Sequence, residues 1–413
     1  MFNIYYTTMK KLPLLFVCLF IISFARAQQL NVVTTGVPFL MVAADARAAG
    51  MGDQGVATSS DTFSQQWNPA KYAFALDKQG FTVSYTPYLT SLVNDISLAE
   101  LNYYNKLDER SAFAGSLRYF GLGNIELRET GEANEQTRTV SPNEFAIDGS
   151  YSLKLSKKFA MGIGGRYIRS SLRVPTEIGD ASPASSYAMD VAGFYQSEEI
   201  AYNEFNGRWR AGFNIQNLGP KISYDKNSTD ITKSNDNFLP ANLKVGAGFD
   251  FILDDYNKVA LNLEFNKLLV PTLKVHENDG VYEGADMDKS GGPITIEDYN
   301  LAKDEYKSIG WLPGIFQSFS DAPGGFSEEL KEITYAAGAE YLYQDSFAMR
   351  LGYFHESPEK GGRQFFSLGA GFKYTTIKVD VSYLFSASKI PNPLENTLRF
   401  SLTFNFGDKY EEY

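Results

Sequence analysis

The feature that most constrains this sequence is a series of fourteen segments of about ten residues in which apolar side chains alternate with small or polar ones. In one segment, Phe145, Ile147 and Tyr151 alternate with residues that include Asp148 and Ser150. Successive side chains of an extended chain point to opposite faces, so each segment has one apolar and one wetter face. This pattern is typical of a membrane barrel, whose strands face lipid outside and the lumen inside.

The lengths of the connectors support this fold. The expected strands cover residues 81–89, 94–105, 111–130, 143–155, 159–172, 185–197, 208–217, 241–252, 257–267, 332–343, 346–356, 364–374, 377–386 and 396–406. Connectors after even-numbered strands are mostly short, and those after odd-numbered strands are mostly longer. Outer-membrane barrels have short periplasmic turns and long outer loops, and an even strand count returns both chain ends to the periplasm. A soluble β-sandwich, the alternative, gives no reason for this segregation.

The chain begins with a predicted signal peptide. Lys10 and Lys11 precede the apolar run 12–24, and a small-x-small motif at 25–27 supplies a cleavage site. The run is too short to span a bilayer comfortably, which makes a membrane-anchoring helix the weaker interpretation. We therefore expect an exported protein that is integral to the outer membrane.

Net charge and cysteine content limit the classes of partner and of chemistry that this chain can have. Without residues 1–27 the chain has 35 basic and 49 acidic residues, a net charge of about −14, which argues against nucleic acid and against tight binding to anionic headgroups. Cys18, the only cysteine, is expected to leave with the signal, so the mature chain offers no thiolate and no disulfide. We expect protein partners and contact with outer-membrane lipid.

The most apolar strands indicate which face meets lipid. Their apolar ladders include Val245, Phe372, Val379 and Phe400. The charged residues across the pleat must point into the lumen, because they would be costly in lipid; they are Lys244, Asp250, Lys373, Lys378, Asp380 and Arg399. Glycines also gather on this inner face, at 162, 164, 246, 248, 369 and 371. They either allow the barrel to curve or make room for an inserted segment.

A candidate insert precedes the first strand. Residues 28–80 contain a Gly/Ala-rich stretch at 45–52 and an Asn-Pro-Ala turn at 68–70. The stretch resembles the N-terminal hatch of the long-chain fatty-acid transporter family, in which such elements precede a fourteen-stranded barrel. The resemblance implies a hatch inside the lumen, with candidate residues Asp45, Arg47, Gly50, Met51, Gly52, Asn68 and Pro69.

Three stretches in order give a closer resemblance. They are DARAAGMGDQGVA at 45–57, WNPAKYA at 67–73 and GWLPGIFQSFSDAPGGFSEELKE at 310–332. Together they resemble the outer-membrane barrel family of the type IX secretion system over essentially all of the mature chain. The resemblance implies a non-enzymatic barrel that docks against the outer-membrane translocon and receives secreted proteins with C-terminal sorting domains. It also implies delivery of that cargo to the cell-surface attachment complex.

The expected organisation is a signal peptide at 1–27, a hatch at 28–80, a barrel at 81–406 with a long extracellular loop at 268–331, and a short C-terminal tail at 407–413. The fold class is all-β, a 14-stranded antiparallel transmembrane β-barrel with the hatch inside its lumen.

The long loop carries an apolar cluster that cannot be a strand in lipid, consisting of Trp311, Leu312, Pro313, Ile315, Phe316 and Phe319. Glycine and proline at 310, 313, 314 and 323–325 are expected to fix its turns, with Ser327 as the N-cap of a following helix. The apolar side chains either fold down as a lid over the lumen or bind a partner.

The main alternative function is passive uptake of hydrophobic small molecules. Gly121-Leu122-Gly123 in the third strand interrupts the alternation and could open a lateral exit in the wall. The other interpretation is that this strand simply leaves the membrane there.

Enzymatic and metal chemistry are weakly indicated. Only His276 and His355 could serve as imidazole bases for lipid hydrolysis, and no serine stands at a recognisable spacing from them. An EF-hand spacing is present in Asp286, Asp288, Ser290, Gly291 and Glu297. Because Pro293 and the lack of a preceding helix favour an ordinary acidic loop, we expect no metal, no cofactor and no enzymatic activity.

Overall fold

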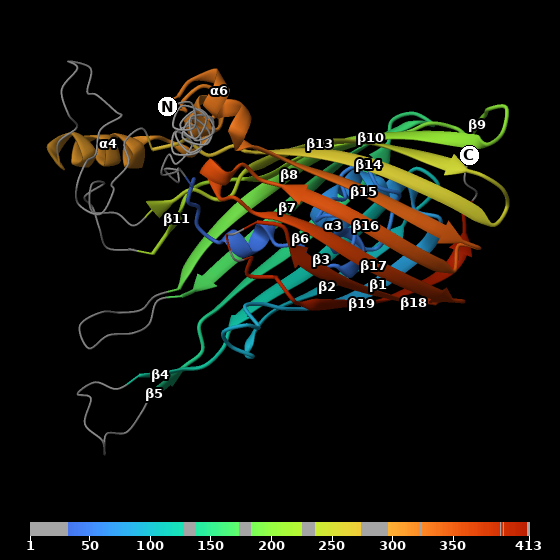
Figure 1. Cartoon of the computed structure of the whole chain (residues 1–413), viewed down its shortest axis with the longest axis horizontal. Helices are drawn as coiled ribbons and strands as arrows, with labels where there is room; N and C mark the ends of the chain where they lie inside the picture. Colours follow the sequence, from blue (N-terminus) through green and yellow to red (C-terminus); the bar gives the residue numbers. More distant parts are fainter. Residues whose placement is uncertain are drawn as a thin grey trace, which may run out of the picture.

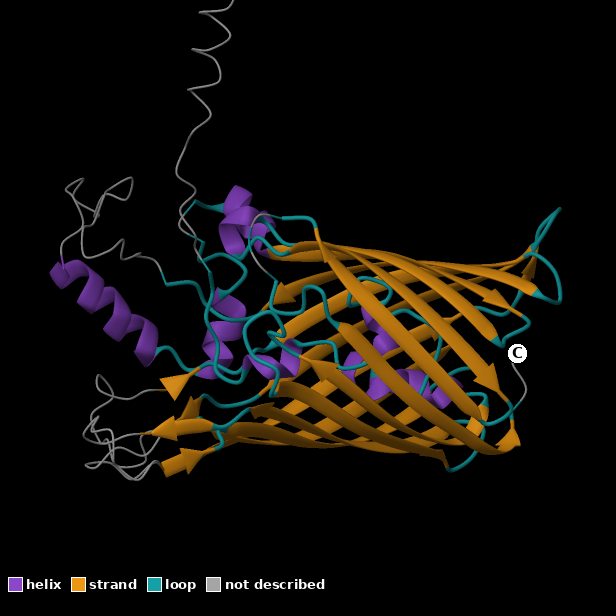
Figure 2. Ribbon diagram, turned by 60° about the horizontal axis from the view of Figure 1, so that its bottom comes forward, coloured by secondary structure: helices purple, strands orange, loops and turns teal. Residues whose placement is uncertain are grey.

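The computed structural model describes residues 32–127, 138–172, 183–224, 236–273, 296–322, 324–388, 390 and 392–410. Its largest sheet has 15 strands, of which the two-residue β9 (Ile200–Ala201) only lines the edge of β10. The other strands form a closed antiparallel ring (Figures 1 and 2), because β13 pairs with β10 and β1 pairs with β19. The ring strands are β1 (Asp77–Pro87), β2 (Ile96–Lys106), β3 (Ser111–Leu122), β6 (Asn143–Lys154), β7 (Phe159–Ser171), β8 (Ala184–Gln196), β10 (Asn206–Leu218), β13 (Asn242–Ile252), β14 (Asn257–Leu268), β15 (Ile333–Tyr343), β16 (Phe347–His355), β17 (Gln364–Tyr374), β18 (Ile377–Ser386) and β19 (Leu398–Lys409).

This ring confirms the predicted 14-stranded barrel, with the larger changes at three strand ends. Strand β1 begins at Asp77, within the range expected for the hatch, and β19 runs to Lys409, into the expected tail. The third strand was predicted to reach residue 130 but ends at Leu122. Gly123 has a φ of 75°, a conformation that ends the strand, and residues 125–127 form β4 (Ile125–Leu127), which pairs with β5 (Arg138–Val140) outside the ring.

The predicted faces of the strands are also confirmed. Val245, Phe372 and Phe400 are 47%, 57% and 46% exposed on the outer face, whereas Lys244 and Arg399 are buried inside. The outer face is therefore apolar and the inner face carries the charges, as a barrel in lipid requires.

The two ends of the barrel differ. At the short-turn end, strands are joined by compact turns such as 253–256 and 375–376. At the long-loop end lie the helices that follow β14 (Figure 1). They are α4 (Ile296–Ser308), α5 (Trp311–Gln317), α6 (Phe326–Glu329) and the 3-10 turn η4 (Leu330–Glu332). The connection from β10 to β13 carries the small pair β11 (Ile222–Ser223) and β12 (Asp236–Asn237), and η5 (Pro358–Lys360) follows β16. Among the described helices, none is long and apolar enough to cross a membrane.

Most of residues 36–75, blue in Figure 1, lie in the lumen and run along its length (Figures 1 and 2). They form η1 (Pro38–Met41), α2 (Ala46–Ala49), α3 (Ser64–Trp67) and η2 (Pro69–Phe74). At the long-loop end, Gly36 N–H donates to the Phe238 carbonyl at 2.9 Å; at the short-turn end, Lys106 Nζ donates to the Ala75 carbonyl at 3.0 Å. Both ends of the ring, the start of β1 and the end of β19, lie at the short-turn end, as the even strand count predicted. Gly36 lies at the other end, because the segment crosses the lumen once before β1 begins.

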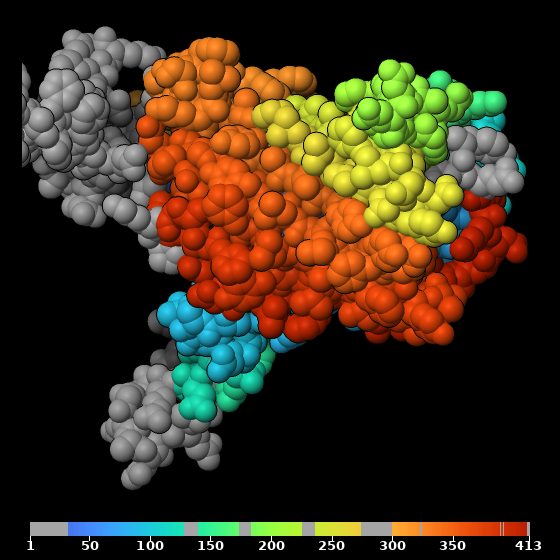
Figure 3. Space-filling model, turned by 45° about the vertical axis from the view of Figure 1, so that its right-hand side comes forward, coloured from blue at the N-terminus to red at the C-terminus, as the bar shows by residue number. Residues whose placement is uncertain are grey.

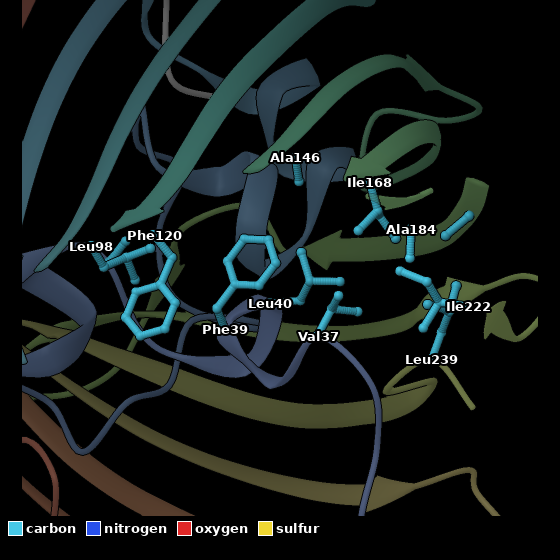
Figure 4. Close-up of a cluster of buried hydrophobic side chains, with 12 residues drawn as sticks. Val37, Phe39, Leu40, Leu98, Phe120, Ala146, Ile168, Ala184, Ile222 and Leu239 are labelled. Carbon is cyan, nitrogen blue, oxygen red and sulfur yellow. The ribbon is translucent and has the colours of Figure 1, made fainter. Parts of the chain in front are cut away.

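The outer half of the lumen holds an apolar cluster (Figure 4). Val37, Phe39 and Leu40 of the N-terminal segment are at most 6% exposed and pack against wall residues that include Phe120 and Ile168. The rings of Phe39 and Phe120 are stacked with centroids 6.1 Å apart. The chain thus fills the apolar part of its own lumen.

Candidate functional site: a filled lumen and an outer apolar surface

Asp45 organises the first helix of the N-terminal segment. It is the N-cap of α2, where its Oδ1 accepts a hydrogen bond from Ala48 N–H at 2.7 Å. Its Oδ2 accepts from Trp67 Nε1, also at 2.7 Å. One buried carboxylate therefore ties α2 to α3, two helices too short to be stable alone.

Arg47 joins the segment to the barrel wall. Its guanidinium donates to Glu340 on β15 at 2.7 and 3.1 Å and to Asp61 at 2.6 Å. Glu340 also accepts from Arg350, which in turn pairs with Asp380 at 2.7 Å. All the charges of this network are paired, which is the condition for burying them without a large desolvation cost.

Gly50, Met51 and Gly52 pass close to the wall. Gly52 has a φ of 84°, which favours glycine, and its N–H donates to Ser367 Oγ at 2.9 Å. A Cβ atom built on Gly352 of β16 would overlap the backbone of Met51 and Gly52. The backbone here lies directly against the wall, where a side chain would not fit.

The inner-face glycines are explained in part by this insertion. A Cβ atom would lie 2.7 Å from Ala70 N at Gly162, 2.6 Å from Val56 Cγ1 at Gly246 and 3.1 Å from Gly50 Cα at Gly369. At Gly164 the same atom would meet only ordinary contacts. The inserted segment therefore accounts for some of these glycines and not for others. Gly212, Gly338 and Gly352 of the wall also contact the segment, and they were not predicted.

Asn68 and Pro69 form the turn between α3 and η2. Asn68 Oδ1 accepts from Ala70 N–H at 3.1 Å, while its Nδ2 donates to the carbonyls of Val56 at 2.9 Å and Gly193 at 3.0 Å. Asn68 has extended backbone angles, as expected before proline, and Pro69 starts η2 at a position where no N–H is needed. The turn thus holds the segment to β8.

Two other wall contacts were not anticipated. Glu264 Oε2 on β14 accepts from the N–H groups of Gly55 and Val56, both at 2.8 Å, and Arg399 pairs with Asp53 at 2.8 Å. Arg399 was predicted to face the lumen, but its partner could not be read from the strand pattern.

The long loop presents apolar side chains outward. Leu312, Phe316 and Phe319 are 50%, 69% and 49% exposed, and Phe326 and Leu330, which the sequence analysis missed, are 77% and 52% exposed. We call these five residues the outer apolar surface; the segment that carries them stands at one end of the barrel in orange (Figure 3). Of the other predicted loop residues, Pro313 is exposed, and Trp311 and Ile315 are half-buried.

Close packing fixes α5 in place. A Cβ atom on Gly314 would lie 3.0 Å from the Phe238 ring and 3.1 Å from Pro271, so the helix contacts the neighbouring loop at this glycine. Glycine and proline were expected to fix the turns of this segment, and here Gly310 is the N-cap of α5. Pro313 is the third residue of α5, where the missing N–H costs no helical hydrogen bond.

Ion pairs fasten α6 and η4 to the rim. Lys360 pairs with Glu328 at 2.5 Å and with Glu332 at 3.1 Å, and Lys267 pairs with Glu329 and Glu332 at 3.0 and 2.8 Å. Burial alone would lower the pKa of Lys360, but its hydrogen bonds with the two glutamates raise it. The predicted N-cap is wrong: Gly325, with a φ of 69°, occupies that position, and Ser327 lies within the helix.

The two remaining candidate sites are the histidines and the calcium-like spacing. The ring of His355 stacks on Tyr335 with centroids 4.7 Å apart, and its neighbour Glu356 pairs with Arg363 at 2.9 Å. Within the described part of the chain, no group of three or more His, Cys, Asp or Glu residues is arranged to hold a metal. His276 and the calcium-like residues 286–291 lie outside the described residues, as does the predicted signal peptide; the side chain of Glu297 is also not described.

A closed antiparallel ring with an apolar outer face and a lumen filled by the chain itself defines an integral β-barrel protein of the outer membrane. The family described as "Type IX secretion system protein PorV" matches residues 25–275, more than half of the sequence. This chain belongs to that family of type IX secretion system proteins. The long-loop end is accordingly the cell-surface end.

Several solved barrels are similar in structure. The Pseudomonas putida toluene transporter TodX is 12% identical, with 86% of this chain and 95% of that chain covered, at a TM-score of 0.44. The Ralstonia pickettii toluene transporter TbuX is 10% identical, with 88% and 98% covered, at 0.45. A Pseudomonas aeruginosa FadL homologue is 11% identical, with 89% and 99% covered, at 0.43. These likenesses add nothing to what the strand topology shows. No curated protein matches the sequence.

Proposed function

We propose that this barrel is a non-enzymatic docking and delivery subunit of type IX secretion. It docks on the outer-membrane translocon, receives secreted proteins with C-terminal sorting domains and passes them to the cell-surface attachment complex. The observation that supports docking is the outer apolar surface, five large apolar side chains that are about half or more exposed at the cell-surface end.

These five side chains lie within residues 312–330, outside the lipid-facing wall. Apolar surface in water is unfavourable by about 25 cal/mol per Å², and exposed apolar patches on soluble parts of proteins commonly mark interaction sites. The alternative was a lid over the lumen. The outer lumen is instead occupied by Phe39 and Leu40, while the pairs of Lys267 and Lys360 hold α6 with Phe326 outward. Docking explains this arrangement better than a lid.

The filled lumen also bears on the uptake alternative. A hydrophobic solute would have to displace a segment held by Arg47, Asn68 and Glu264. Strand β3 pairs in unbroken register with β2 and β6 up to Gly121 and Leu122, so the interruption seen in the sequence does not open the wall there. These features favour protein docking over passive uptake.

The docking proposal is tested by replacing Leu312 and Phe316 together with alanine, with Leu92→Ala as the matched control on another outer loop, where Leu92 is 76% exposed. Removal of two buried interface side chains typically weakens binding by about tenfold or more. We expect the double variant to assemble normally, to lose co-purification with the translocon from gently solubilised membranes, and to fail in surface display of cargo. Normal co-purification of the double variant would contradict the proposal.

A second comparison separates the two functions. Deletion of this protein should abolish surface display of proteins with C-terminal sorting domains while growth on a hydrophobic carbon source continues. The opposite pair of results would favour uptake.

A further inference from the structure

The N-terminal segment crosses the lumen from one end to the other, and contacts along its length fix the direction. Near the long-loop end, Arg118 Nη1 donates to the Leu40 carbonyl at 2.9 Å and Thr86 Oγ1 donates to the Ala44 carbonyl at 3.0 Å. Further along, Asn68 Nδ2 donates to the carbonyl of Gly193, near the short-turn end of β8. Earlier residues of the segment therefore lie progressively closer to the cell surface.

The outer end of the segment meets the long loop. Phe238 accepts a hydrogen bond from Gly36 N–H through its carbonyl at 2.9 Å, and its ring packs edge-on against Tyr306 of α4 at 5.4 Å. The same ring contacts α5 at Gly314. Phe238 thus joins the N-terminal segment to the loop that carries the outer apolar surface, and Val32, four residues before Gly36, is 50% exposed.

The described residues 32–35 have the character of an unpaired strand. Their sequence is Val-Val-Thr-Thr, all β-branched residues that favour an extended backbone, and their exposure alternates along the chain. They belong to no helix or strand of the structure. An extended segment of this kind can add to the open edge of a partner's β-sheet, where main-chain hydrogen bonds provide affinity.

We propose that residues 32–35 are displayed at the cell surface and that they add as a strand to a sheet edge of the protein that docks on the outer apolar surface. The proposed exposure at the cell surface depends only on the path of the N-terminal segment through the lumen. Strand addition also rests on the proposed docking function, because its partner is the translocon that the outer apolar surface is proposed to bind.

Display is tested with single cysteines in a Cys18→Ser background, in cells that lack the translocon so that no partner covers the site. A membrane-impermeant maleimide should label Val32→Cys on intact cells as fully as Leu92→Cys on an outer loop. The control Asp255→Cys, in the short turn between β13 and β14, should be labelled only after the outer membrane is opened. Labelling of Val32→Cys only after opening, or only after denaturation, would overturn display.

Strand addition is tested with Thr34→Pro against Thr34→Ala. Proline removes the N–H and cannot join a ladder, whereas alanine keeps it. We expect Thr34→Pro to reduce co-purification of the translocon by about threefold to tenfold and Thr34→Ala to leave it unchanged. Equal recovery with both variants would overturn the strand contact even if Val32→Cys is labelled. If Thr34→Pro loses co-purification of the translocon while the double alanine variant at Leu312 and Phe316 keeps it, the proposed docking surface is wrong and the strand contact is supported.

Discussion

The Arg47 guanidinium of the N-terminal segment lies 2.7 Å from the Glu340 carboxylate of β15, and both side chains are at most 5% exposed inside the lumen. These two residues are 293 positions apart in the sequence. The pair fixes the segment at a point where Glu340 is also bound by Arg350.

Replacing Arg47 with methionine removes one partner of this buried network. Loss of one side of a buried ion pair typically costs about 3 kcal/mol, because the remaining charge stays desolvated. We expect Arg47→Met to lower the free energy of unfolding in detergent by about that amount, measured by urea denaturation. The control is Lys258→Met, whose pair with Asp345 at 3.2 Å has side chains 32% and 64% exposed and should contribute about 1 kcal/mol or less. Equal losses in the two variants would show that the lumenal pair does not stabilise the barrel.

Alanine at Gly352 tests the close approach of the segment to the wall. The added Cβ would overlap the backbone of Met51 and Gly52, which must then shift, at a cost of about 1 to 3 kcal/mol or more. The matched variant Gly149→Ala, on β6, has no heavy atom within 4 Å of the new Cβ and should be neutral or slightly stabilising. The midpoint temperature of unfolding, measured from the change in gel mobility on heating, distinguishes the two variants. Similar midpoints for the two variants would mean that the segment does not lie against β16.

The loop between α5 and α6 should depend on pH through Asp321. Burial, together with Glu329 and Glu332, raises the pKa of Asp321 from its ordinary 3.8 to about 6, although the Thr272 N–H at 2.9 Å acts in the opposite direction. Between pH 3.8 and about pH 6, Asp321 holds more protons in the folded loop than in the locally unfolded loop. The contribution of Asp321 to the stability of the folded loop is therefore complete below about pH 4 and is lost as the pH rises through about 6.

Hydrogen exchange of residues 311–332 provides the measurement. Protection factors of the natural chain should fall a few-fold from pH 5 to pH 7, relative to Asp321→Asn, which keeps the acceptor for Thr272 without the charge. Parallel curves for the two proteins would exclude Asp321 as the titrating group.

The wall was largely predictable because each strand repeats the same local rule. The ranges 364–374 and 377–386 match β17 and β18 at both ends, since two apolar ladders meet at a two-residue turn. The third strand was overextended, because the interruption at Gly121-Leu122-Gly123 was placed within one strand, whereas Gly123 turns the chain against Asp95. The alternation of apolar and polar residues predicts which face a side chain takes. It does not predict where pairing with the neighbouring strand ends.

The contents of the lumen were predictable only in part. The cap of Asp45 and the turn at Asn68 are local and follow from residue types at fixed spacing. The pairs of Arg47 with Glu340 and of Asp53 with Arg399 depend on ring closure, which brings distant strands around one segment. The wall glycines 338 and 352 stand at inward positions of their strands, and that placement was the available signal for them.

The pairing of β1 with β19 has a consequence for biogenesis. The wall becomes continuous only when the last strand arrives, and the residues directly before β1 are by then enclosed. We therefore expect wrapping and filling to be one step in the maturation of this protein, with no vacant cylinder as a precursor that the leading peptide later enters.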